Sequence, residues 1–184
     1  MKSTRKVSAR RKAVRRSPAL SLSARVERLE KAVLFPARAK LEPSSRFVNL
    51  GPDGRPTTGK HVAVYDHQTG LTWAAAPLGG DEGLQHEAAM KACSELDLLG
   101  HNDWRAATIQ ELLSIVDYTR CDPAVDTSHF LGPYGWTWSS TIAAAPSGYA
   151  WNVYLGDGYS SRSRQGGHGR VRAVRAGQSL ALGL

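Results

Sequence analysis

The segment Gly100–Tyr118 constrains the fold most, because a polar loop runs directly into a strongly specified helix. Thr108 is a natural N-cap, and Glu111 follows three residues later, so each side chain can bond the backbone amide of the other. The apolar residues that follow recur at helical steps, at Ile109, Leu112, Leu113 and Val116. This capping box and apolar stripe predict an amphipathic helix of about three turns that closes at Asp117–Tyr118 and needs covering by other parts of the chain.

Positive charge is concentrated at the N-terminus: the first sixteen residues carry eight cations and no acid, and the formal net charge of the 184-residue chain is +8. The cations are Lys2, Arg5, Lys6, Arg10, Arg11, Lys12, Arg15 and Arg16. We expect residues 1–19 to form a basic arm that contacts an anionic partner, either nucleic acid, an acidic lipid surface or an acidic protein face. A solvated tail that aids assembly is the alternative.

A heptad-like seam follows the arm, formed by Leu22, Val26, Leu29 and Val33. It predicts a short coiled-coil helix over residues 20–35 that joins protomers into a homo-oligomer, with a trimer favoured. Phe35-Pro36 ends this helix because proline donates no amide hydrogen bond. Residues 36–59 are predicted to be a linker that could include an edge strand at Phe47–Leu50. No apolar run follows the basic start, so the sequence predicts neither a secretory signal nor a membrane span.

Residues 60–176 are predicted to form one α+β domain with two helices and an antiparallel sheet, followed by a tail at 177–184. A hairpin at 61–74 and a helix over 83–96 precede the capped helix. A meander follows it, with strands at 136–141, 149–155, 159–165 and 170–175. We expect the tryptophans to be core anchors, at Trp73, Trp104, Trp136, Trp138 and Trp151.

The two cysteines do not form a metal-binding or disulfide framework. Cys93 shares the apolar stripe of the 83–96 helix with Ala89 and Leu96, which indicates a buried thiol. A Cys93–Cys121 disulfide is the alternative. His61 and His67 have no second ligand at helical spacing, so we expect no metal site and no cofactor.

The order of these motifs resembles the Lcl C-terminal domain, a module of a collagen-like bacterial adhesin that is widespread in bacterial and phage proteins. The resemblance covers about residues 60–176 and rests on Asp66-x-x-Thr69-Gly70-Leu71-Thr72-Trp73, Ala92-Cys93-x-x-Leu96 with Leu98-x-Gly100, Asp103-Trp104-Arg105-x-x-Thr108-x-x-Glu111-Leu112, Pro123-Ala124-Val125-Asp126, Trp138-Ser139-Ser140-Thr141, Ala150-Trp151-x-Val153 with Gly156-x-Gly158, and Val171-Arg172-x-Val174-Arg175. Ala106-Ala107 stand where the family usually has Leu-Pro. The resemblance implies a C-type lectin-like fold whose sheet presents a variable ligand surface, and attachment to glycans or surface polymers.

Catalysis is not expected. Formylglycine-generating enzymes, which are related by this fold, need closely spaced cysteines near the C-terminal strands, and no cysteine follows Cys121. The sequence also has no nucleophile elbow, phosphate loop or paired-histidine helix. Trp151-Asn152-Val153 lacks the carboxylate that calcium-dependent lectins place there, so calcium-dependent sugar binding is not expected either.

The candidate ligand surface is the wet side of the last hairpin and its loops: Tyr149, Asn152, Tyr154, Asp157, Tyr159, Arg162, Arg164, His168 and Arg170. Tyrosine and arginine beside serine and glycine are typical of recognition surfaces, although a merely polar sheet face is the alternative. We therefore expect a non-catalytic attachment module on a phage virion or a bacterial surface that binds a host-surface glycan or protein. The alternatives are a structural or cementing virion protein that the basic arm anchors to a neighbouring subunit, and a nucleic-acid-associated protein.

Overall fold

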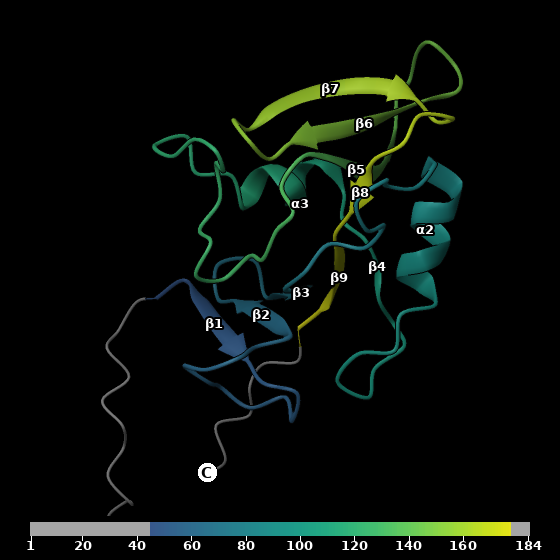
Figure 1. The fold of residues 1–184 in the computed structure, drawn as a ribbon. Helices are drawn as coiled ribbons and strands as arrows, with labels where there is room; N and C mark the ends of the chain where they lie inside the picture. Colours follow the sequence, from purple (N-terminus) through teal and green to yellow (C-terminus); the bar gives the residue numbers. More distant parts are fainter. Residues whose placement is uncertain (1–44, 178–184) are drawn as a thin grey trace, which may run out of the picture. The chain divides into compact units, whose positions relative to one another are not determined.

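The computed structural model describes residues 45–177. The predicted basic arm, the predicted oligomerising helix and residues 178–184 lie outside this part. Its elements are β1 (Phe47–Leu50), β2 (Ala63–Asp66), β3 (Leu71–Ala74), α2 (His86–Ser94), β4 (Arg105–Ala106), α3 (Ile109–Ser114), β5 (Trp136–Ile142), β6 (Tyr149–Tyr154), β7 (Tyr159–Arg164), β8 (Arg170–Val171) and β9 (Ala173–Ala176) (Figure 1). The α+β class and its two helices are confirmed for the described residues. Neither helix is long and apolar enough to cross a membrane.

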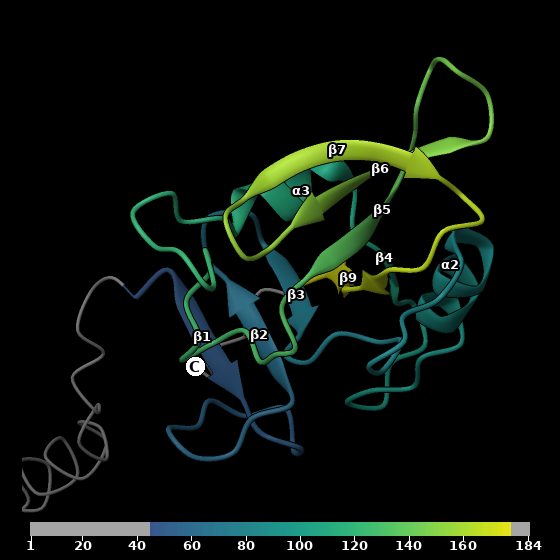
Figure 2. The same ribbon diagram turned by 45° about the horizontal axis from the view of Figure 1, so that its top comes forward.

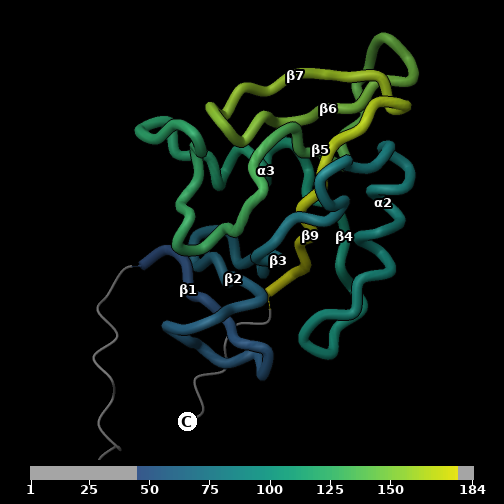
Figure 3. Tube along the Cα trace, viewed as in Figure 1, coloured from purple at the N-terminus to yellow at the C-terminus, as the bar shows by residue number. Residues whose placement is uncertain are grey.

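The strands form two sheets, where the sequence predicted one antiparallel sheet. The first sheet has the order β1-β2-β3-β9-β4 and the second the order β7-β6-β5-β8. The chain changes sheets at Arg172: β8 pairs with β5 in parallel, and β9 pairs antiparallel with β3 and β4. Figure 3 follows this last segment from the second sheet into the first. The expected single strand at 170–175 is therefore two short strands in different sheets.

The N-terminal edge of the first sheet is β1, which pairs antiparallel with β2 over all four of its residues. The edge strand predicted at Phe47–Leu50 is thus confirmed. Because Leu50 packs in the hydrophobic core, this strand belongs to the fold of the domain.

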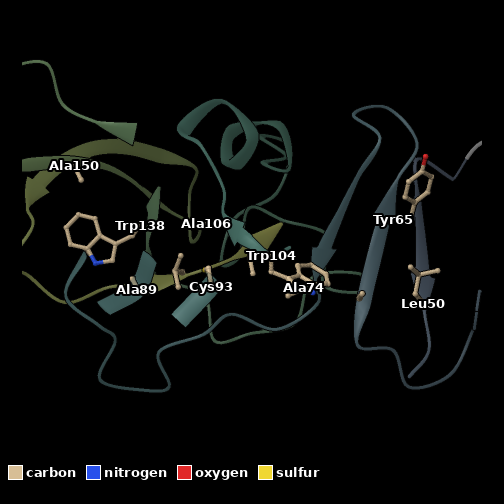
Figure 4. Packing of buried hydrophobic residues seen from close by; sticks show 12 residues of the cluster. Leu50, Tyr65, Ala74, Ala89, Cys93, Trp104, Ala106, Trp138 and Ala150 are labelled. Carbon is tan, nitrogen blue, oxygen red and sulfur yellow. The ribbon is translucent and has the colours of Figure 1, made fainter. Parts of the chain in front are cut away.

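Helix α2 covers one side of the core, as expected, but is shorter than the predicted range. It buries His86, Ala89 and Cys93, and Trp138 lies beside Ala89 and Ala150 (Figure 4). The buried position of Cys93 is confirmed. Cys121 is exposed and both thiols are free, so the alternative of a Cys93–Cys121 disulfide is wrong in this structure.

Helix α3 begins with the predicted capping box. Thr108 Oγ accepts from the Glu111 amide at 3.2 Å, and the Glu111 carboxylate accepts from the Thr108 amide at 2.7 Å. The helix has six residues, so the prediction of about three turns is wrong. It ends at Ser114; the amides of Ile115 and Val116 donate three residues back, and the Asp117 amide then donates to the Ala124 carbonyl of the following loop at 2.8 Å. Ile115 is consequently buried, while Leu113 and Val116 are half-buried.

Three of the five tryptophans are core residues, as expected: Trp73, Trp104 and Trp138 are at most 2% exposed. Trp151 is half-buried against the second core cluster. Trp136 is 40% exposed, so its predicted core position is wrong. It starts β5, whereas Trp138, two residues further along the same face, is covered and donates its Nε1–H to the Leu84 carbonyl at 2.9 Å.

Candidate recognition surface

The first polar motif, around Asp66, stabilises the fold through hydrogen bonds within the domain. Its buried carboxylate accepts from Arg46 Nε at 2.9 Å and Nη2 at 2.7 Å, and from Thr69 Oγ at 2.8 Å. Burial alone would raise the pKa of Asp66, but these hydrogen bonds and one from the Gln68 amide hold it below its ordinary value. Asp66 therefore fixes the turn between β2 and β3.

The second polar motif, around Trp104, also joins elements. Arg175 donates to the Asp103 carboxylate from Nε at 2.7 Å and from Nη2 at 3.1 Å, which ties β9 to the loop before β4. Arg105 donates to Glu111 from Nη2 at 2.6 Å and from Nη1 at 2.8 Å. These bidentate pairs join elements of the fold, although the Asp103 and Arg105 side chains are about half exposed.

The register of the second sheet divides the candidate residues between two opposite faces. Residues paired across neighbouring strands lie on the same face, and successive residues alternate. Tyr154 pairs with Trp136 of β5 and with Tyr159 of β7, whereas Tyr149 pairs with Arg164 and Trp151 with Arg162. The expected single wet side therefore consists of two separate surfaces.

We call the first of these surfaces the aromatic face; it comprises Trp136, Tyr154 and Tyr159. The Trp136 ring centroid lies 5.3 Å from that of Tyr154 and 6.2 Å from that of Tyr159. Trp136 is 40% and Tyr159 60% exposed. Tyr154 packs against Gly156, where any side chain would collide with the ring. The rings are thus held in place while two of them remain open to solvent.

Farther along the same face of the sheet, side chains of β5 and β6 are buried. Asn152, in register with Trp138, is only 3% exposed and donates through Nδ2 to Ser163 Oγ at 2.8 Å. Its predicted position on the wet side is wrong, because this part of the sheet is covered by the core. The open area of the face is limited to the end that carries Trp136.

We call the opposite surface the arginine face; it comprises Tyr149, Arg162 and Arg164. Arg164 Nε donates to Tyr149 Oη at 3.1 Å, and its guanidinium carbon lies 5.7 Å from the centre of the tyrosine ring. Arg162 Nη1 donates to the Ala145 carbonyl at 2.5 Å. A shallow depression of about 600 Å³ adjoins this pair and is lined by Ser147, Gly148, Tyr149, Arg164, Gln165, Gly166 and Gly167.

The three remaining candidates lie in or beside turns. Asp157 is exposed in the β6–β7 turn, where Oδ1 accepts from the Tyr159 amide at 2.8 Å. His168 is exposed before β8. Arg170 is half-buried and donates to the Gly80 carbonyl at 3.1 Å and the Asp81 carbonyl at 3.3 Å. Asp157 thus borders the aromatic face, while Arg170 holds a loop.

Sequence reasoning missed Trp136 as a surface residue. Its position beside Tyr154 depends on the pairing of β5 with β6, for which the sequence carries no local signal. Within residues 45–177, no cluster of three or more His, Cys, Asp or Glu side chains is placed to hold a metal ion.

Comparison with known proteins supports the motif order described above. A search of the curated proteins finds no match to this chain. Residues 62–175, more than half of the sequence, match the family model described as the Lcl C-terminal domain. This region runs from the residue before β2 to within β9 and includes both helices and both faces of the second sheet. The chain therefore belongs to the Lcl C-terminal domain family.

Proposed function

We propose that this domain is a non-catalytic, C-type lectin-like attachment module that binds a glycan of a host surface through its aromatic face. The observation that carries the proposal is the register of Trp136, Tyr154 and Tyr159, which places three rings side by side on a face whose Trp138 and Asn152 are buried. Rigid aromatic rings provide contact area at small entropic cost. The C–H face of a sugar ring is a suitable partner for such a surface.

Polar groups beside the rings complete this surface. Ser161 lies on the same face of β7 as Tyr159 and is half-exposed, and the Asp157 carboxylate is exposed in the adjacent turn. A hydroxyl and a carboxylate can bond sugar hydroxyls while the rings contact the C–H groups. The arrangement favours a neutral pyranose over a charged ligand on this face.

A binding role agrees with the protonation of the Cys93 thiol and with the ion pairs of three carboxylates. Cys93 is buried, and burial raises the pKa of its thiol to about 12, so the reactive thiolate is absent at neutral pH. The carboxylates of Asp66, Asp103 and Glu111 are engaged by arginines. This supports attachment rather than catalysis.

The glycan proposal is tested with the full-length chain on an array of neutral and anionic glycans. Trp136→Ala is expected to weaken binding to the preferred neutral glycan by at least about tenfold, as loss of a central aromatic contact does. Ile142→Ala removes another exposed apolar side chain from the same strand and should leave binding intact. Equal binding by the wild type and the Trp136 variant would reject the aromatic face as the glycan site.

A structural or cementing role in a virion is the second candidate, because the cations of residues 1–16 are separate from a charge-balanced remainder. In this proposal the basic arm anchors the protein to a neighbouring subunit or to nucleic acid, and residues 20–35 join protomers. Deletion of residues 1–16 should abolish incorporation into particles but spare glycan binding. DNA retention that falls steeply with added salt would instead favour nucleic acid as the partner of the arm.

A further inference from the structure

The outer strand of the second sheet, β7, presents an open edge. It pairs with β6 along all six of its residues and has no strand on its other side among the described elements. Figures 1 and 2 both show β7 at the border of the described domain. An open edge offers backbone groups to an extended chain.

The hydrogen-bond pattern identifies the backbone groups at this edge. The Gln165 amide donates to the Gly148 carbonyl at 2.9 Å, and hydrogen-bonded pairs alternate along an antiparallel ladder. Ser161 and Ser163 therefore direct their backbone groups toward β6. Ser160 and Arg162 direct their N–H and C=O groups outward, where no strand of the described part of the chain pairs with β7.

The side chains beside this edge carry positive charge that no acid of residues 45–177 matches. Arg162 and Arg164 lie two residues apart on one face, and neither forms an ion pair within residues 45–177. By contrast, four other arginines of the domain each pair with a carboxylate: Arg46, Arg105, Arg120 and Arg175. Within the described residues, the guanidinium hydrogen bonds of Arg162 and Arg164 go to the Ala145 carbonyl and the Tyr149 hydroxyl.

We propose that the β7 edge binds an extended segment of another protein that carries two acidic residues separated by one residue. Side chains two apart on a strand are about 7 Å apart on the same face, so such a segment places one carboxylate opposite each arginine. Its backbone continues the ladder at Ser160 and Arg162. This site goes beyond glycan binding, because Arg162 and Arg164 lie on the face of β7 opposite to Tyr159 and the other rings of the aromatic face.

The test measures binding of the full-length chain to a labelled peptide with glutamate at alternate positions, by fluorescence anisotropy. Ser160→Pro removes an outward amide and blocks strand addition, while proline is tolerated at an edge position. We expect this variant to bind the peptide at least about tenfold more weakly. N-methylation of the peptide amides that face β7 should have the same effect, and Arg55→Gln, which removes an exposed arginine from the β1–β2 loop, should have none.

A charge exchange provides a second readout that needs no proline. Arg162→Glu with Arg164→Glu should abolish binding of the acidic peptide and permit binding of a peptide with lysines in place of the glutamates. The inference is overturned if the N-methylated peptide binds as well as the unmodified one, since attraction would then be purely electrostatic. It is also overturned if a sulfated oligosaccharide binds through these arginines and the peptide does not. Neutral-glycan binding that depends on Trp136 is unaffected by either result.

Discussion

At the scale of single residues, Arg172 is a charged side chain that the fold holds in its interior. It is fully buried where the chain changes sheets, and its Nη1 donates to the Ala75 carbonyl at 2.9 Å and its Nη2 to the Leu131 carbonyl at 2.7 Å. Burial lowers the pKa of Arg172 to about 10, so the side chain is still charged at neutral pH. Carbonyl dipoles and the Phe130 ring, 5.6 Å away, take the place of a carboxylate partner.

Replacing Arg172 tests how much this arrangement stabilises the fold. Arg172→Ala leaves the Leu131 carbonyl without its donor, removes one of the two donors of the Ala75 carbonyl and opens a cavity. We therefore expect the free energy of unfolding to fall by about 3 kcal/mol or more. Arg162→Ala, an exposed arginine, should change it by less than about 0.5 kcal/mol. Urea unfolding followed by tryptophan fluorescence measures both. A small effect at position 172 would mean that water enters and satisfies the carbonyls.

At the scale of elements, α3 shows what local sequence determines and what it does not. The capping box was predictable because Thr108 and Glu111 are three residues apart and need no distant partner. The length of the helix was not, since the apolar stripe continues to Val116 whereas the helix ends at Ser114 and the Asp117 amide bonds the Ala124 carbonyl of a later loop. The aromatic face was partly predictable. The hairpin pattern predicted Tyr154 and Tyr159 as surface residues, whereas the position of Trp136 depends on the pairing of β5 with β6.

The capping box also predicts a pH dependence of stability. The hydrogen bond from Arg105, followed by those from Thr108, outweighs the effect of burial and lowers the pKa of Glu111 from 4.5. A carboxyl group whose pKa is lower in the folded state stabilises the fold above its unfolded pKa, and this contribution is lost as the pH falls below about 4.5. Glu111→Gln should therefore lower the free energy of unfolding at neutral pH. It should also reduce the loss of that free energy in acid, the acid limb of the stability curve.

The matched control for this effect is the other half of the capping box. Thr108→Ala removes the hydroxyl acceptor but keeps the carboxylate and Arg105, so it should cost about 1 kcal/mol and leave the acid limb in place. Urea unfolding between about pH 7 and pH 3 distinguishes the two variants. An unchanged acid limb in Glu111→Gln would assign the pH dependence to other carboxylates.

At the scale of the whole described domain, distant contacts decide the architecture. The sheet change at Arg172 depends on carbonyls 97 and 41 residues away in the sequence, and no local pattern specifies such partners. Distant contacts also position β1, which is hydrogen-bonded to the loop before β5. Asn49 Oδ1 lies 2.7 Å from His129 Nδ1, and Asn49 Nδ2 donates to the Ser128 carbonyl at 3.0 Å. The sequence predicted an edge strand here but not what holds it.

This attachment of β1 should weaken in mild acid. Burial lowers the pKa of His129 from 6.5, and the nearby His61 lowers it further, against the opposing effect of Asp126. Because the unfolded chain takes up the proton first, the stabilising contribution of neutral His129 is present above about pH 6.5 and is lost as the pH falls from there. Hydrogen exchange of the Phe47–Leu50 amides should accelerate between about pH 7 and pH 5 by more than the intrinsic chemistry accounts for. His129→Gln should remove that excess, and His67→Gln, which changes an exposed histidine in the β2–β3 turn, should retain it. An excess that persists in His129→Gln would show that another group controls the edge strand.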